Sequence, residues 1–219
     1  MAKRFEDVEI GTYGTAEVAH WLRIPARTVR SWISDDGIIV PAEPSLLSFM
    51  NVLELHVVKG MRKIHEIPMQ RIRRAIEHVS SMYPSRHPLV DREFQTDGVD
   101  VFIEDLGEYV NVSRLGQKGF KDIVSTYLRR IGWSSEGVAE VFHPFVLGDA
   151  PSEPKLIAMN PRVSFGKPVI SGTGISTALV AARFNSARES VSSLAEEYGL
   201  SQAQIEEAIR WETAQPVAA

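Results

Sequence analysis

The sequence predicts an α+β protein: an N-terminal winged helix-turn-helix, a middle small antiparallel sheet with a helix, and a C-terminal trihelical helix-turn-helix-like domain. Three observations support this class. Apolar residues recur at helical spacing near both ends of the chain. Two short apolar segments flank Asp97-Gly98 in the middle, a pattern typical of a β-hairpin. A stretch with one Gly and two Pro, residues 147–154, separates the middle from the C-terminal part.

The first forty residues predict two short helices and a wing. Thr15 can cap the first helix, and Pro25 suits the first turn of the second. A turn containing Gly37 then precedes three β-branched residues that end at a proline. The first predicted helix covers residues 15–22 and the second covers 26–33, with a break at 23–25 between them. The turn covers 35–37, and the strand of the wing covers 38–40.

Two longer helices come next. Ser45 opens a helix from Leu46 to about Ile64 that is apolar on most faces, so we expect it to be buried. Pro68 opens a second helix, whose inner stripe consists of Met69, Ile72, Ile76 and Val79.

The middle of the chain predicts a sheet with one helix, and the end predicts a helical domain. The two strands of the expected hairpin cover 90–95 and 99–104, and a third strand covers 109–112. A helix over 120–131 follows, and a strand over 138–142 returns to the sheet. The C-terminal part has a strand-like piece at 163–170 and helices near 177–185, 192–198 and 201–212. The predicted domains are therefore 1–88, 89–147 and 155–219.

Composition is that of a soluble globular protein, with 44% hydrophobic and 24% charged residues among 219. No apolar run approaches the roughly 18 residues that span a bilayer, and the N-terminus lacks the apolar stretch of a signal peptide. The absence of cysteine excludes disulfides, thiolate metal sites and a cysteine nucleophile. We therefore expect a cytoplasmic protein that does not contact a membrane.

Charge divides the chain into a mildly basic front and an acidic rear. The net charge is −4; residues 1–90 hold twelve Lys/Arg and ten Asp/Glu (+2), which leaves twelve and eighteen (−6) for residues 91–219. If the chain binds DNA, we expect the front to do so.

Motifs for enzymes are lacking. The glycine-rich segments around Lys167 do not complete a phosphate-binding loop, because Pro168 follows where Ser or Thr is needed. None of the six histidines has metal-ligand spacing, and no Gly-x-Ser-x-Gly elbow occurs. We expect a protein that is not an enzyme and binds no cofactor or metal.

The predicted first helix pair is a candidate DNA-binding unit. Its second helix exposes Arg27, Thr28, Arg30 and Ser31, and Arg23 lies in the break before it. Arginine can pair with phosphate or donate two hydrogen bonds to guanine, and hydroxyls can bond either group. The alternative is a pair of short core helices with a solvated charged face.

The same spacing recurs at the C-terminus. Ala195, Gly199 and Ile205 repeat the intervals of Ala19, Arg23 and Val29. The last helix, however, carries Glu206, Glu207 and Glu212 against Arg210 alone. Because acidic side chains repel the phosphate backbone, we interpret this second pair as a protein-contacting or dimerising unit, with DNA contact as the alternative.

A C-terminal motif resembles a known family. Residues 161–175, PRVSFGKPVISGTGI, are similar to a short antitoxin domain once known only as a domain of unknown function, and the segment 194–200 fits its continuation. The family pattern has Asp-Pro where this chain has Asn160-Pro161, and Arg where it has Gly174. With its N-terminal part, the whole chain resembles the longer VapB-type antitoxins, and residues 15–33 with the wing resemble MerR-type regulators.

The resemblance implies an antitoxin that neutralises a PIN-domain ribonuclease toxin and, as a DNA-binding repressor, regulates the shared operon. We expect double-stranded operator DNA and the toxin as partners, and a homodimer within a larger toxin–antitoxin complex, since operators are commonly read by two-fold pairs. Because such toxins hold carboxylates, the candidate toxin-binding residues are the rear arginines Arg162, Arg183, Arg188 and Arg210.

The alternative function is a MerR-like ligand-sensing regulator. In that case the middle hairpins would form a small-molecule pocket lined by aromatic residues, namely Phe94, Phe102, Tyr109 and Tyr127.

Overall fold

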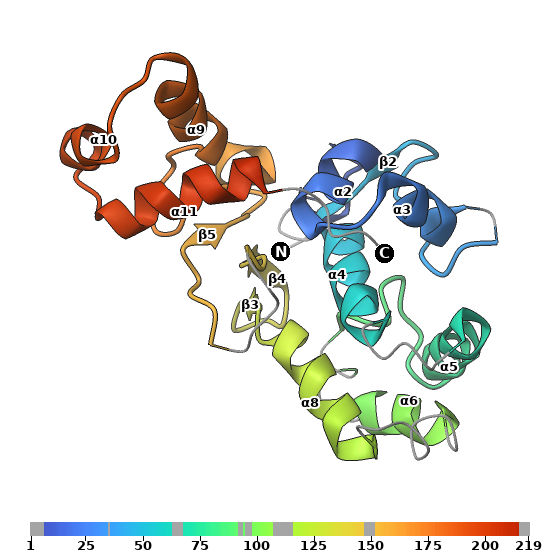
Figure 1. The fold of residues 1–219 in the computed structure, drawn as a ribbon. Helices are drawn as coiled ribbons and strands as arrows, with labels where there is room; N and C mark the ends of the chain where they lie inside the picture. Colours follow the sequence, from blue (N-terminus) through green and yellow to red (C-terminus); the bar gives the residue numbers. More distant parts are fainter. Residues whose placement is uncertain are drawn as a thin grey trace.

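A computed structural model describes residues 7–34, 36–62, 68–91, 94, 98–106, 116–146 and 152–214. The α+β class is confirmed, because the described parts contain α-helices together with small two-stranded antiparallel sheets (Figure 1). The helices are α2 (Thr15–Leu22), α3 (Ala26–Ile33), α4 (Phe49–Arg62), α5 (Met69–Met82), α6 (Val99–Leu106), α8 (Gly116–Leu128), α9 (Thr177–Ser186), α10 (Val191–Tyr198) and α11 (Gln202–Thr213). The strands are β1 (Tyr13–Gly14), β2 (Leu46–Leu47), β3 (Ile131–Trp133), β4 (Ala139–Phe142), β5 (Ile157–Ala158) and β6 (Val169–Ile170).

The first two helices, α2 and α3, have the predicted bounds. The predicted cap is wrong: Gly14 rather than Thr15 precedes the helix, and the Glu17 carboxylate accepts a hydrogen bond of 3.0 Å from the Gly14 N–H. Pro25 occupies the N-cap of α3 instead of its first turn. The two helices bury Val18, Ala19, Val29 and Trp32 among other residues, as their apolar spacing predicts.

The predicted wing strand at 38–40 is not a strand. The backbone N–H groups of Ile38 and Ile39 both bond to the Trp32 carbonyl, which folds this segment back onto the end of α3. The sheet that flanks the helix pair instead joins β1 to β2, with Tyr13 opposite Leu47.

Helix α4 runs through the middle of the core, as its apolar faces predict. It begins at Phe49 rather than Leu46, because Leu46 and Leu47 pair with β1 and the Ser48 hydroxyl accepts the Asn51 N–H. Helix α5 begins after Pro68, and its predicted stripe faces inward.

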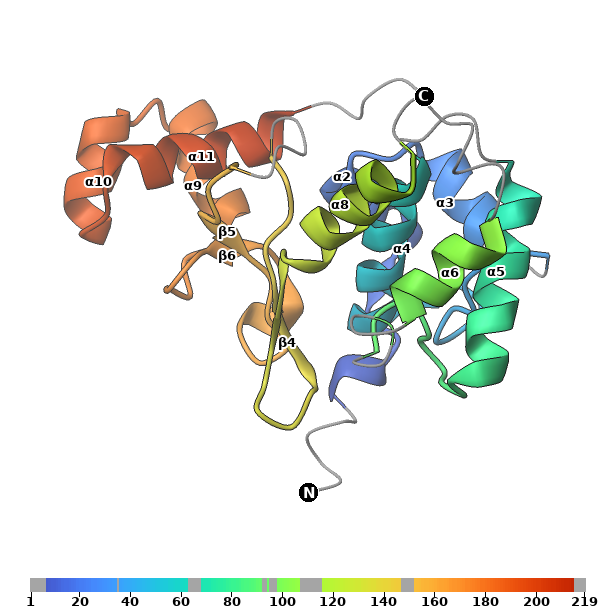
Figure 2. The ribbon, with the colours of Figure 1, turned by 90° about the horizontal axis from the view of Figure 1, so that it is seen from below.

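The predicted hairpin over 90–104 is wrong. Residues 99–106 form helix α6, because Val99, Phe102 and Ile103 are buried together at helical spacing. Phe102 contacts Phe94 and Phe120, with ring centroids 6.1 and 5.9 Å apart. Helix α6 consequently packs against α5 and α8, and α8 packs against α4 (Figure 2). The predicted strand 109–112 lies outside the described residues.

Strands β3 and β4 form a hairpin whose second strand lies next to the β5–β6 pair. The end of β4 continues into a bridge between Phe142 and Met159, next to the β5–β6 pair. The buried Arg130 ties down the segment before β5, because its guanidinium donates to the carbonyls of Pro144, Glu153 and Pro154. Only residues 152–154 of the predicted linker lie in the described part.

The three predicted C-terminal helices are present as α9, α10 and α11. The predicted capping box of the last helix is also present, with Ser201 and Gln204 satisfying each other's backbone N–H groups. One hydrophobic cluster extends from Val18 in α2 through α4 to Trp211 in α11. Within the described ranges, no helix is both long and apolar enough to cross a membrane.

Candidate nucleic-acid interface

The two helix pairs contain the same turn. Arg23 follows α2 with φ 55° and ψ 41°, and Gly199 follows α10 with φ 65° and ψ 36°, so both residues adopt the left-handed conformation. In each turn the N–H of the next residue, Ile24 or Leu200, bonds to the carbonyl of the alanine five residues earlier, at 3.0 and 2.9 Å. We call α2–α3 the front pair and α10–α11 the rear pair.

The outer face of α3 is basic. Arg27 and Arg30 are exposed, and within the described residues neither side chain forms a hydrogen bond or ion pair. Thr28 is half-buried, Ser31 is exposed, and the helix contains no acidic residue. Two free guanidinium groups one helical turn apart can bind successive phosphates or a guanine edge.

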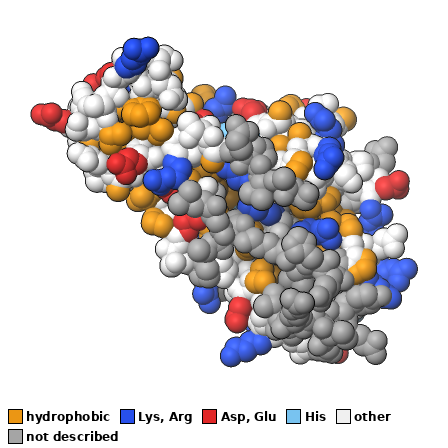
Figure 3. Space-filling view, in the orientation of Figure 1, with side chains coloured by type: hydrophobic (Ala, Val, Ile, Leu, Met, Phe, Trp, Pro, Cys, Tyr) orange, Lys and Arg blue, Asp and Glu red, His pale blue; other side chains and the backbone are white. Residues whose placement is uncertain are grey.

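Basic side chains continue from α3 to α5. Arg73 on α5 donates to the Asp36 carbonyl in the turn after α3, and the neighbouring Arg74 is exposed. Figure 3 shows Lys and Arg side chains along the edge of the molecule formed by these two helices. The surface of positive charge is therefore wider than α3 alone.

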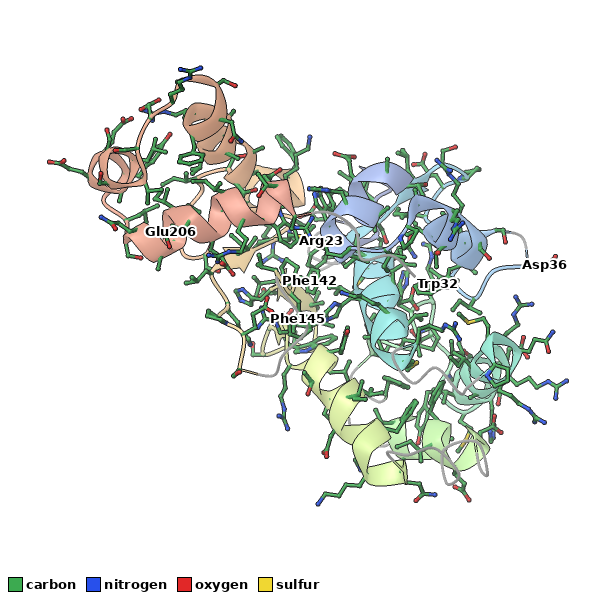
Figure 4. The ribbon with its side chains drawn as sticks, viewed as in Figure 1. Arg23, Trp32, Asp36, Phe142, Phe145 and Glu206 are labelled. Carbon is green, nitrogen blue, oxygen red and sulfur yellow. The ribbon has the colours of Figure 1, made fainter. Side chains whose placement is uncertain are left out.

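The rear pair presents the opposite charge at the corresponding place. Arg30 stands seven residues after the turn residue of the front pair, and Glu206 stands seven residues after that of the rear pair. Glu206 is exposed on α11 (Figure 4). Glu207 is buried and accepts from Arg210, while Glu212 accepts from the Thr177 hydroxyl. The backbone geometry is shared, but the exposed charge at the corresponding position is opposite.

Arg23 does not lie on the exposed face with Arg27 and Arg30. It is buried at 6% exposure, and Figure 4 shows it between the front pair and the end of α11. Its guanidinium donates to the carbonyls of Trp211 and Ala214 and to the His20 carbonyl. Arg23 thus joins the front pair to the rear pair, and it lies apart from the exposed face that holds the other predicted DNA-binding residues.

The four rear arginines differ in their surroundings. Arg183 donates hydrogen bonds to Glu189, Glu197 and Tyr198. These hydrogen bonds raise the pKa of its guanidinium, and the bond to Glu197 has the largest effect. Arg162 pairs with Glu140 at 3.1 Å, and Arg210 pairs with Glu207. Among the described residues, Arg188 is exposed and has neither a hydrogen bond nor an ion pair, so it is the rear arginine most available to a carboxylate.

A buried charged cluster lies away from both faces. The ring of His87 is 2.8 Å from Glu54 through Nδ1 and 2.8 Å from Glu9 through Nε2. Both carboxylates are engaged by this imidazole, so the cluster is structural. No group of three or more His, Asp or Glu suited to a metal ion occurs in the part of the chain that the structure describes.

The aromatic residues proposed to line a sensor pocket belong to the core. Phe94, Phe102 and Tyr127 are each at most 1% exposed, and Tyr127 packs against His56 and Phe145. Tyr109 lies outside the described residues.

Sequence reasoning missed two residues. The sequence pattern groups Arg23 with the DNA-binding residues, although its place in the repeat, where the rear pair has Gly199, signals that an unusual constraint holds it there. The pattern gives Phe165 no role, yet this residue is 82% exposed and has φ 55°. No residue pattern marks an exposed aromatic side chain before the backbone around it is known.

Comparisons with known proteins agree with the resemblance. A family model described as a protein of unknown function, DUF433, matches residues 157–211. The chain is 27% identical to a Mycobacterium tuberculosis (strain ATCC 25618 / H37Rv) protein named "Putative antitoxin VapB45", over 92% of this chain and 93% of that one. A crystal structure of Rv2018 from Mycobacterium tuberculosis has 28% sequence identity and a TM-score of 0.73, and covers 91% of this chain and 98% of that chain. The resemblance to VapB-type antitoxins is confirmed.

Proposed function

We propose that this chain is an antitoxin that neutralises a PIN-domain ribonuclease and represses its own operon by binding operator DNA. The observation that carries the antitoxin assignment is the likeness, over nearly the full length of both chains, to a protein named as an antitoxin. We assign DNA binding to the front pair and toxin binding to the C-terminal part because the same turn precedes a basic helix, α3, in one place and an acidic helix, α11, in the other.

In this proposal the front pair is a helix-turn-helix and α3 enters the major groove. Arg27 and Arg30 bind base edges or phosphates, assisted by Thr28 and Ser31. Because one such unit buries little surface, a homodimer presents two copies of α3 to an operator with two half-sites.

The C-terminal part, residues 155–219, binds the toxin. A PIN-domain ribonuclease holds carboxylates around its metal site, as the family resemblance implies, so an arginine can enter that site with bidentate hydrogen bonds. Arg188 is the leading candidate, because Arg162, Arg183 and Arg210 are already paired within the chain.

Co-expression tests the proposal. A PIN-domain ribonuclease, the proposed toxin, is induced in bacterial cells with or without the full-length chain. We expect the chain to relieve growth arrest, and the Arg27→Ala/Arg30→Ala variant to relieve it equally while losing repression of an operator–reporter fusion. Growth arrest that persists beside a soluble, folded chain would refute the antitoxin assignment.

A further inference from the structure

Phe165 is the most exposed of the large apolar side chains in the described residues, at 82%. It lies in a short 3₁₀ turn (Ser164–Gly166) inside the segment that the family model matches. Isolated exposed apolar residues are common, but the backbone that presents this one is not ordinary.

Three successive residues of this turn have positive φ. The angles are 50° at Ser164, 55° at Phe165 and 74° at Gly166. For a residue with a Cβ this conformation costs on the order of 1–3 kcal/mol, and it persists only where the surroundings enforce it. Strain of this kind concentrates at functional sites.

Tyr13, the residue of strand β1 that pairs with Leu47, holds this turn in place. The Tyr13 hydroxyl donates to the Phe165 carbonyl at 3.2 Å, and a Cβ at position 166 would lie 1.8 Å from that hydroxyl oxygen. Tyr13 itself is buried at 2% exposure, so it cannot move aside at low cost. The aromatic ring of Phe165 is therefore presented to solvent on a fixed backbone.

The charges beside the turn match a protein partner better than a nucleic acid. Lys167 lies 3.8 Å from Glu17, and Arg162 lies 3.1 Å from Glu140, so each cation is balanced by an anion. A phosphate backbone requires a surplus of cations, whereas an apolar centre with a rim of both charges is the composition of a protein interface.

We propose that Phe165 is the aromatic anchor through which this chain binds its toxin, and that the toxin supplies an apolar pocket for the ring. This proposal rests on the proposed function, and it gives the chain a second contact with the toxin in addition to that of the inserted arginine. An aromatic side chain on a fixed backbone loses little conformational entropy on binding, which is why such residues carry much of the affinity of interfaces.

Full-length variants test this inference with the purified PIN-domain ribonuclease proposed as the toxin. Phe165→Asn removes the ring but accepts positive φ, and Phe165→Gly accepts it equally, so both keep the turn. Leu179→Asn, at another exposed apolar position on α9, is the matched control. Calorimetry measures toxin affinity, light scattering measures the oligomeric state of the chain, and circular dichroism checks the fold.

We expect both Phe165 variants to weaken toxin binding at least tenfold, with the control within twofold of wild type. Unchanged toxin affinity in folded Phe165 variants would overturn the inference while leaving the proposed function intact. Dissociation of a dimer with unchanged toxin affinity would also overturn it, since the ring would then contact a second copy. A wild-type chain that does not bind the ribonuclease would overturn the proposed function and this inference together.

Discussion

The guanidinium of Arg23 lies 4.6 Å from the centroid of the Trp211 ring, so the turn of the front pair is in direct contact with the last helix of the rear pair. The same guanidinium donates to the Trp211 and Ala214 carbonyls. The final carbonyls of a helix lack partners within it and carry partial negative charge, so a cation at this end is stabilising. Arg23 therefore caps α11 from a part of the chain almost two hundred residues away.

Replacing Arg23 with glycine tests this cap. Glycine accepts the left-handed turn, so the variant removes the cap without disturbing the path between α2 and α3. We expect the free energy of unfolding to fall by about 1–3 kcal/mol, because hydrogen bonds from a charged group are lost while strain is relieved. Urea denaturation measures the change. Arg27→Ala, which loses no hydrogen bond or ion pair with a described residue, is the control and should stay within about 0.5 kcal/mol. An Arg23→Gly midpoint at or above that of wild type would contradict the cap.

Arg27→Ala and Arg30→Ala test the basic face. Each should weaken operator binding by roughly 1–3 kcal/mol if the side chain reads a base. If it contacts phosphate only, the loss should be similar on any sequence, and the slope of log K against log salt should fall by about one. Fluorescence anisotropy at several salt concentrations distinguishes the two cases. Arg188→Ala removes an exposed, unpaired rear arginine and should leave operator binding unchanged; equal losses for all three variants would argue against a front-specific interface.

Gly166→Ala tests the contact between the two ends of the chain. The new methyl group would overlap the Tyr13 hydroxyl and would also require positive φ, so we expect a loss of about 2–4 kcal/mol. Gly172→Ala shares the positive φ but meets nothing within 4 Å, and should cost only about 1 kcal/mol. Gly174→Ala has neither problem and should be neutral. Equal melting temperatures for the first two variants would show that the close approach has no energetic consequence.

The buried imidazole of His87 predicts a pH dependence of stability. Burial alone lowers the pKa of His87, but the hydrogen bonds with Glu54 and Glu9 outweigh it and raise the pKa to about 9. A raised folded-state pKa means that the stabilisation is complete below the unfolded value near 6.5 and is lost as pH rises through about 9.

We therefore expect the unfolding free energy of wild type to fall by on the order of 2–3 kcal/mol between pH 6.5 and 10. His87→Gln should be less stable at neutral pH, because it leaves buried Glu54 without its cation, and should lose less stability over this range. Denaturation curves at several pH values measure both slopes, and parallel slopes in the two proteins would rule out this source of the dependence.

The helix pairs could be predicted from sequence because their determinants are local. The interval from Ala19 to Val29 repeats from Ala195 to Ile205, and the same turn geometry follows in both places. The exposed arginines of α3 could likewise be predicted, since the apolar spacing of a helix defines its opposite face.

Helix α6 and the roles of Arg23 and Phe165 could not be predicted, because they depend on contacts between residues that are distant in the sequence. Apolar residues at 99, 101 and 103 also fit a strand, and only the packing of Phe102 between Phe94 and Phe120 selects the helix. The role of Arg23 depends on carbonyls at 211 and 214, which no local pattern connects to the turn. The position of Phe165 likewise depends on the Tyr13 hydroxyl, far away in the sequence.

The most direct measurement of the central claim is an RNA-cleavage titration with two purified proteins. A PIN-domain ribonuclease, the proposed toxin, is incubated with a labelled RNA substrate and increasing amounts of the full-length chain, without operator DNA. We expect cleavage to fall to background near stoichiometric amounts, and we expect the Arg27→Ala/Arg30→Ala variant to inhibit equally well. Undiminished cleavage in the presence of excess folded wild-type chain would contradict it.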